Sequence, residues 1–212
     1  MTELRLDTMT IDRPAPRATK AGASNAVLSL PNTVPLVLDL DGTLIRGDLL
    51  YLSFFSILRR NPLAALMTPV WLLRGRAALK RQLALRNRIA WDRIILHEDV
   101  VALALREKAT GRRVVLATAA DAVLANQLAS RLPWIDEVFA SDGRHNLKGA
   151  NKATLLRQTF PHGFIYAGDS ASDLAVWAQA AGIITVNANE AVRKAVRALG
   201  KPTLHLPGRR LI

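Results

Sequence analysis

Cysteine is absent from this chain of 212 residues, and aromatic residues make up only 5% of it. The lack of cysteine excludes a disulfide scaffold and a cysteine metal site, and it is compatible with a reducing compartment. Paired Cys/His ligands and aromatic–basic runs are also missing, so nucleic acid is not the expected partner. The net charge of +12 instead favours phosphate-bearing partners such as nucleotides or anionic lipid headgroups.

The short motifs of several enzyme classes are missing as well. The sequence has no Gly-x-Ser-x-Gly elbow for Ser/His/Asp hydrolysis, no Gly-x-Gly-x-x-Gly for a dinucleotide and no Walker loop. Its four histidines have no metal-ligand spacing, and we interpret all of them as structural or surface residues: His97, His145, His162 and His205.

The order of apolar segments indicates the fold. Residues 1–33 are rich in Pro, Ala, Ser and Thr, lack the apolar run of a signal peptide, and are expected to form a disordered tail. From residue 34 onward short apolar strands alternate with helical patterns, which predicts an α/β, Rossmann-like parallel sheet with helices on both faces. Strands are expected at 36–40, 113–117, 137–140, 164–167, 183–186 and 203–206, and helices at 47–90, 99–110, 121–131, 150–159, 171–181 and 191–199.

The most informative motif is Asp39-Leu-Asp41-Gly-Thr43, directly behind the apolar run 34–38. A strand there would deliver both carboxylates to its carboxyl end, the edge where α/β sheets bind ligands. The two acids repel each other, so they require a shared cation or proton. Gly42 allows a turn close to a ligand, and Thr43 offers a hydroxyl and an N–H group to an anion. The plain structural alternative is an Asp-Gly turn after a strand.

Three further polar clusters follow later strands. They are Thr118 with Ala119, the pair Lys148 and Lys152 around Gly149, and Gly168-Asp169-Ser-x-x-Asp173. Each has a structural alternative, since Thr or Asp after a strand often caps the next helix. Right-handed crossovers place all the strand ends at one edge, however, so the four clusters together predict one site.

These motifs, in this order, resemble the four motifs of the haloacid dehalogenase (HAD) superfamily, and most of all its phosphoserine-phosphatase-like branch. The resemblance covers about residues 34–190. It implies a HAD-fold core domain at 34–46 and 96–206, with a small helical cap at 47–95 inserted after the first strand. It also implies a Mg²⁺-dependent phosphatase that acts through an aspartyl-phosphate intermediate.

The resemblance assigns a role to each motif residue. Asp39 would be the nucleophile, Asp41 the general acid and then base, and Thr118 a ligand of the phosphoryl group. Lys152 would neutralise the carboxylates and the phosphoryl group, with Lys148 as the alternative. Mg²⁺ would be held by Asp39, the carbonyl of Asp41, Asp169 and Asp173, and the substrate would contact Gly42, Thr43, Ala119 and Lys148.

Two alternatives to the phosphatase stay open. A phosphotransferase or mutase acting on a soluble metabolite would use the same residues, and a non-catalytic regulatory domain could keep the fold. The acid at position 41 argues against a dehalogenase, which attacks carbon and needs no acid there, and against a P-type ATPase, which would carry lysine.

The cap region has an unusual composition. Ten basic and only two acidic residues fall between positions 45 and 95, around two apolar runs that are too short to span a bilayer. One interpretation is a set of packed helices with solvated basic faces. The other is an interfacial helical hairpin that lies on anionic lipid and admits a lipid-linked phosphate.

A narrower resemblance favours the second interpretation. The segments 58–62, 71–80, 116–121, 140–143 and 146–149 are similar to HAD domains found ahead of UbiA-type membrane prenyltransferases. Such proteins handle polyprenyl phosphates or diphosphates, which implies a prenyl-type phosphate as substrate and a membrane prenyltransferase as a partner. The sequence ends at Ile212 without a membrane domain, so we expect a free-standing relative or part of a longer chain, in the cytoplasm or peripheral at the inner face of the membrane.

Overall fold

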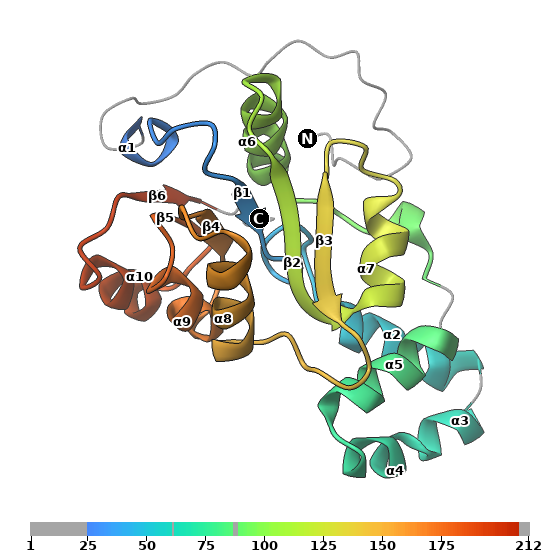
Figure 1. Cartoon of the computed structure of the whole chain (residues 1–212). Helices are drawn as coiled ribbons and strands as arrows, with labels where there is room; N and C mark the ends of the chain where they lie inside the picture. The colour runs from blue at the N-terminus through green and yellow to red at the C-terminus, as the bar shows by residue number, and fades with distance from the viewer. Residues whose placement is uncertain (1–24, 61, 87–88, 208–212) are drawn as a thin grey trace.

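The protein is described by a computed structural model over residues 25–60, 62–86 and 89–207 (Figure 1). In these residues the strands form one six-stranded sheet in the order β3-β2-β1-β4-β5-β6, in which all neighbours are parallel. This confirms the predicted α/β, Rossmann-like fold. The strands are β1 (Leu36–Leu38), β2 (Val114–Asp121), β3 (Glu137–Ser141), β4 (Ile165–Gly168), β5 (Gly182–Val186) and β6 (Thr203–Leu206).

Helices cover both faces of the sheet, and side chains alternate between these two faces along each strand. In β1, Leu36 and Leu38 face one core with α6 (Glu98–Ala109) and α7 (Ala122–Ala129), whereas Val37 faces the other. That second core contains α8 (Ala150–Thr159), α9 (Leu174–Trp177) and α10 (Glu190–Arg197). Continuous apolar strands of this kind are typical of parallel sheets covered on both sides.

The region predicted to be a helical cap, which we call the cap, contains α2 (Leu49–Arg60), α3 (Pro62–Leu66), α4 (Thr68–Leu73) and α5 (Arg76–Arg86), followed by the short 3₁₀ turn η2 (Trp91–Arg93). One long helical stretch was expected over 47–90, and the structure instead breaks it into four helices. Pro62 and Pro69 lie at the starts of α3 and α4, and Gly75 adopts φ +100° before α5. Ile57, Trp71 and Leu83 form a small core of their own between these helices.

The predicted disordered tail over 1–33 is wrong for its last nine residues, while residues 1–24 lie outside the described ranges. Helix α1 (Asn25–Leu28) buries Val27 completely in the main core. The reason is Arg112, whose buried guanidinium pairs with Glu107 at 2.9 Å and donates hydrogen bonds to the carbonyls of Leu30, Pro31 and Val34 at 2.6–2.9 Å. These bonds hold the segment before β1 against the sheet.

Two further boundaries differ from the prediction. Strand β2 continues past residue 117 to Asp121, because Asp121 pairs with Ser141 of β3 beyond an irregularity in the register. The helix expected over 171–181 is split into η3 (Ala171–Asp173) and the short α9. Within the described ranges, none of the helices combines the length and the apolar character that crossing a bilayer requires.

Candidate active site

The carboxyl edge of the sheet and the cap enclose a cavity of about 710 Å³. The core contributes residues after β1, β3 and β4 and at the carboxyl end of β2, and the cap contributes residues from α2, α4 and α5. Of the sequence-predicted site residues, the cavity is lined by Asp39, Asp41, Gly42, Ala119, Lys148, Lys152, Asp169 and Asp173.

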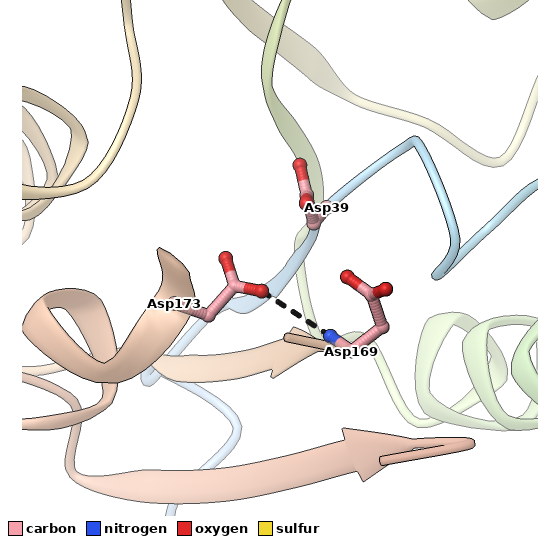
Figure 2. A group of neighbouring side chains, drawn as sticks. All are labelled: Asp39, Asp169 and Asp173. Carbon is pink, nitrogen blue, oxygen red and sulfur yellow. Dashed lines mark hydrogen bonds between the residues drawn. The ribbon is translucent and has the colours of Figure 1, made fainter. Parts of the chain in front are cut away.

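Three carboxylates meet at the floor of this cavity (Figure 2). Oxygen atoms of Asp39, Asp169 and Asp173 lie within 4.8 Å of one another. Asp39 follows β1, Asp169 follows β4, and Asp173 ends η3. The Oδ2 atom of Asp173 accepts hydrogen bonds from the N–H groups of Asp169 and Ser170, both at 3.2 Å, which fixes its orientation.

The electrostatics of this cluster call for a cation. Burial, together with the charges of Asp173 and Asp39, raises the pKa of Asp169 from 3.8 to about 7. Burial and the charge of Asp39 also raise the pKa of Asp173. Three converging carboxylates are hard oxygen donors of the kind that Mg²⁺ binds, so the residues present fit a magnesium ion.

Lys152 supplies a positive charge beside the cluster. It lies on α8 with only 2% of its surface exposed, and its Nζ donates hydrogen bonds to Asp39 Oδ1 at 2.8 Å and to Tyr166 Oη at 2.7 Å. Lys148, the alternative lysine, is instead exposed at the cavity. The structure therefore places Lys152, rather than Lys148, against the expected nucleophile.

Tyr166 was not predicted from the sequence. Its hydroxyl donates to Asp173 Oδ1 at 2.9 Å while it accepts from Lys152, so it links the lysine to the carboxylate cluster. Burial and the charges of Asp39 and Asp173 raise the pKa of Tyr166 well above its ordinary value, which keeps the hydroxyl protonated. A tyrosine in a strand that is otherwise aliphatic, two residues before Gly168, is the only signal the sequence offered.

Asp41 lies apart from the three carboxylates. Its Oδ1 accepts a hydrogen bond from the N–H of Leu49 at the start of α2, at 2.8 Å. Burial, with smaller contributions from the charges of Asp48 and Asp39, raises the pKa of Asp41 from 3.8 to about 7. A carboxyl group with this pKa can both donate and accept a proton near neutral pH.

Gly42 is required by two features of the turn that follows Asp41. Its φ is +76°, and a Cβ atom added there would come within 2.4 Å of Asp169 Oδ2. The backbone therefore approaches the carboxylate cluster more closely than any side chain would permit.

Thr43 and Thr118 do not occupy the predicted positions, because both are fully buried and neither lines the cavity. The N–H of Thr43 donates to the carbonyl of Leu40 at 3.3 Å, which closes the turn, and its hydroxyl is buried without a partner. Thr118 lies inside β2 rather than at its end, and its hydroxyl accepts from the N–H of Ala120 at 2.9 Å. The predicted contacts of these two residues with substrate are therefore not supported by this structure.

Lys80 is a cavity residue that the sequence did not single out, because it belongs to a long basic run. From α5 its Nζ reaches the core and donates to Ala119 O at 2.6 Å and to Asn146 Oδ1 at 3.0 Å. Burial and the nearby charge of Lys148 lower the pKa of Lys80, although Asp41 acts in the opposite direction. The next residue, Arg81, pairs with Asp121 at 3.1 Å, so α5 is joined to the core at two adjacent positions.

Comparison with known proteins agrees with this geometry. A sequence model of the haloacid dehalogenase-like hydrolases matches residues 36–178. An uncharacterised protein of Sinorhizobium fredii, y4nM, is 40% identical over 154 residues, which make up 72% of this chain. The aligned region spans only 30% of that relative.

Solved structures share the fold at low sequence identity. A HAD-family hydrolase from Salmonella enterica serovar Typhi has a TM-score of 0.59 at 18% identity, over 85% of this chain and 69% of that one. Phosphoserine phosphatase in its apo form has a TM-score of 0.56 at 18% identity, over 83% of this chain and 94% of that one.

Proposed function

This chain belongs to the haloacid dehalogenase-like hydrolase family, and from that premise we propose that it is a Mg²⁺-dependent phosphomonoesterase that works through an aspartyl-phosphate intermediate. One observation supports this most strongly. The Asp39 carboxylate lies in the cavity, 2.8 Å from the buried Lys152 ammonium and within 4.8 Å of two further carboxylates. A nucleophile, a fixed positive charge and a set of metal-binding oxygens thus lie within reach of one phosphoryl group.

Each residue has a defined part in the proposed reaction. An oxygen of Asp39 attacks phosphorus, the bond from phosphorus to the ester oxygen breaks, and protonated Asp41 gives its proton to the leaving oxygen. In the second step Asp41 takes a proton from water as the water oxygen attacks the phosphoaspartate. Phosphate leaves, Asp39 is regenerated, and Lys152 stabilises the charge on the phosphoryl oxygens throughout.

Mg²⁺ would be held by Asp39, Asp169 and the carbonyl of Asp41, with Asp173 oriented behind them. When bound, it would offset the repulsion between the carboxylates and the phosphoryl group. Tyr166 is then a positioning residue, because it fixes Lys152 and Asp173 without itself facing the phosphoryl group.

The cap side of the cavity favours an apolar leaving group. Five leucines from α2, α4 and α5 line it: Leu49, Leu50, Leu72, Leu79 and Leu83. The same cavity is lined by three basic residues, Arg76 and Lys80 of α5 and Lys148 of the core. A lipid-linked or prenyl-type phosphate offers an anionic head and a hydrocarbon tail that match these two kinds of lining. The resemblance to HAD domains ahead of UbiA-type prenyltransferases stays a prediction that points the same way.

The test is phosphate release from an aryl phosphate with and without Mg²⁺, for the wild type and for Asp39→Asn. We expect Mg²⁺-dependent turnover in the wild type and in the exposed control Asp92→Asn, and none in Asp39→Asn. Turnover of Asp39→Asn above about a tenth of the wild-type rate would contradict the covalent mechanism. Transfer of the phosphoryl group to an added alcohol in preference to water would instead identify a phosphotransferase, and the absence of any wild-type turnover would favour the non-catalytic alternative.

A further inference from the structure

Large apolar side chains are left exposed at one end of the molecule. Among the described residues, ten of the twelve exposed large apolar side chains fall within positions 51–73 of the cap. Six of them belong to α3, α4 and the residue between, and we call this segment, 62–73, the cap tip. One of the six, Leu72, also lines the cavity. Figure 1 shows α3 and α4 at the end of the cap farthest from the sheet. The other five are Leu63, Leu66, Met67, Val70 and Leu73.

These side chains form a stripe. They recur mostly every three or four positions, the spacing of one helical face. Trp71 in the same segment is turned the other way, into the small core with Ile57 and Leu83. Leu63 and Leu73 are 76% and 88% exposed, so the outward face is not covered by any described part of the chain.

The charge around the tip is of one sign. Arg59 near the end of α2 and Arg74 directly after α4 are both exposed, and the sequence has no Asp or Glu from position 49 to position 91. The tip itself carries almost no polar side chains. A protein partner would need hydrogen bonds across the interface, about one for every 100–200 Å². A lipid surface needs none, and it takes up apolar side chains while its headgroups bind the flanking arginines.

We propose that the cap tip docks on the surface of an anionic lipid bilayer. Leu63, Leu66 and Leu73 enter the boundary between headgroups and acyl chains, while Arg59 and Arg74 contact lipid phosphates. Leu72, the neighbour of Leu73, lines the cavity, so docking brings one wall of the cavity next to lipid. The proposal does not depend on the chain being a phosphatase.

Co-sedimentation with vesicles tests it. We expect the wild type to bind vesicles of phosphatidylcholine and phosphatidylglycerol in equal parts at low salt, and to dissociate as salt is added, since these attractions decay within a Debye length. Arg59→Ala combined with Arg74→Ala should weaken binding roughly thirtyfold, because each basic residue contributes about 1 kcal/mol near an anionic surface. Leu63→Ser, Leu66→Ser and Leu73→Ser together should weaken binding more than tenfold.

Matched controls separate the tip from the overall positive charge. Arg157→Ala with Lys194→Ala removes the same charge from exposed positions on α8 and α10, and Leu105→Ser removes an exposed leucine from α6. Both controls should bind like the wild type, and thermal unfolding followed by circular dichroism verifies that every variant is folded. Lys80 and Arg76 are left unchanged because they line the cavity.

Three outcomes would overturn the proposal. The first is a wild type that fails to bind anionic vesicles at low salt. The second is equal loss of binding in the tip variants and in their controls, which would assign binding to net charge alone. The third is self-association of the wild type that the leucine variant abolishes while vesicle binding is unchanged, which would assign the tip to contact between copies of the chain.

Discussion

The carboxylate cluster makes a quantitative prediction for Asp169→Asn. The pKa of Asp169 is raised from 3.8 to about 7 by burial and by the charges of Asp173 and Asp39, so the folded protein resists its ionisation. A difference of this size corresponds to about 4 kcal/mol of folding free energy, and solvent screening of this partly exposed group reduces it to about 2 kcal/mol. Asparagine removes the charge, and the metal-free variant should therefore be more stable than the wild type.

The sign of the pH dependence follows from the protons bound in each state. Below about pH 4 the carboxyl is protonated in both states and the variant gains nothing. Between about pH 4 and pH 7 the folded wild type retains a proton that the unfolded chain has lost, so wild-type stability falls as pH rises. The advantage of Asp169→Asn should grow over that interval and stay constant above it.

Thermal unfolding in a metal chelator measures this effect. A gain of about 2 kcal/mol should raise the Tm by about 4–8 °C at pH 8, with no difference from the wild type at about pH 4. Added Mg²⁺ should stabilise the wild type, by about 2.7 kcal/mol at a concentration of about 100 Kd, and should stabilise the variant much less. A variant less stable than the wild type at pH 8, or one that responds equally to Mg²⁺, would refute this account of the cluster, while the exposed control Asp92→Asn should change neither quantity.

Three further variants test the surrounding groups. Asp41→Asn should slow hydrolysis of alkyl phosphates about 10²–10⁴-fold but that of an activated aryl phosphate much less, and equal losses on both substrates would argue against a general acid. The wild-type rate on alkyl phosphates should decline above about pH 7 as Asp41 loses its proton. Lys80→Met removes hydrogen bonds to Ala119 and Asn146, so steady-state kinetics should show a raised KM and the Tm should fall, whereas Lys194→Met should change neither. Tyr166→Phe removes a hydrogen-bond acceptor of the buried Lys152, which should lower the free energy of unfolding, measured in urea, by about 1–3 kcal/mol and should reduce kcat. Wild-type values of both quantities would mean that the hydroxyl does not position Lys152.

The sequence by itself determined the fold class and the floor of the site. Alternation of apolar strands with helical segments specifies a parallel sheet, and the handedness of its crossovers brings the strand ends to one edge. Asp39, Asp169 and Asp173 could therefore be placed together although two of them are 130 or more positions from the first. Each of these residues follows a strand directly or within a few positions, and strands can be recognised from the local sequence.

Only the tertiary structure decided which side chains reach that edge from elsewhere. Lys80 meets Ala119 because α5 folds back over the core, and Tyr166 meets Lys152 because β4 and α8 contribute to the same side of the core. No local pattern encodes these contacts. The sequence placed Thr118 at the end of its strand, whereas pairing with β3 extends β2 beyond Thr118 and buries its hydroxyl. Long-range hydrogen bonds from Arg112 also hold the segment before β1 in place. The exposure of the cap-tip leucines likewise emerged only from the structure, because periodicity alone does not distinguish a buried helix face from an exposed one.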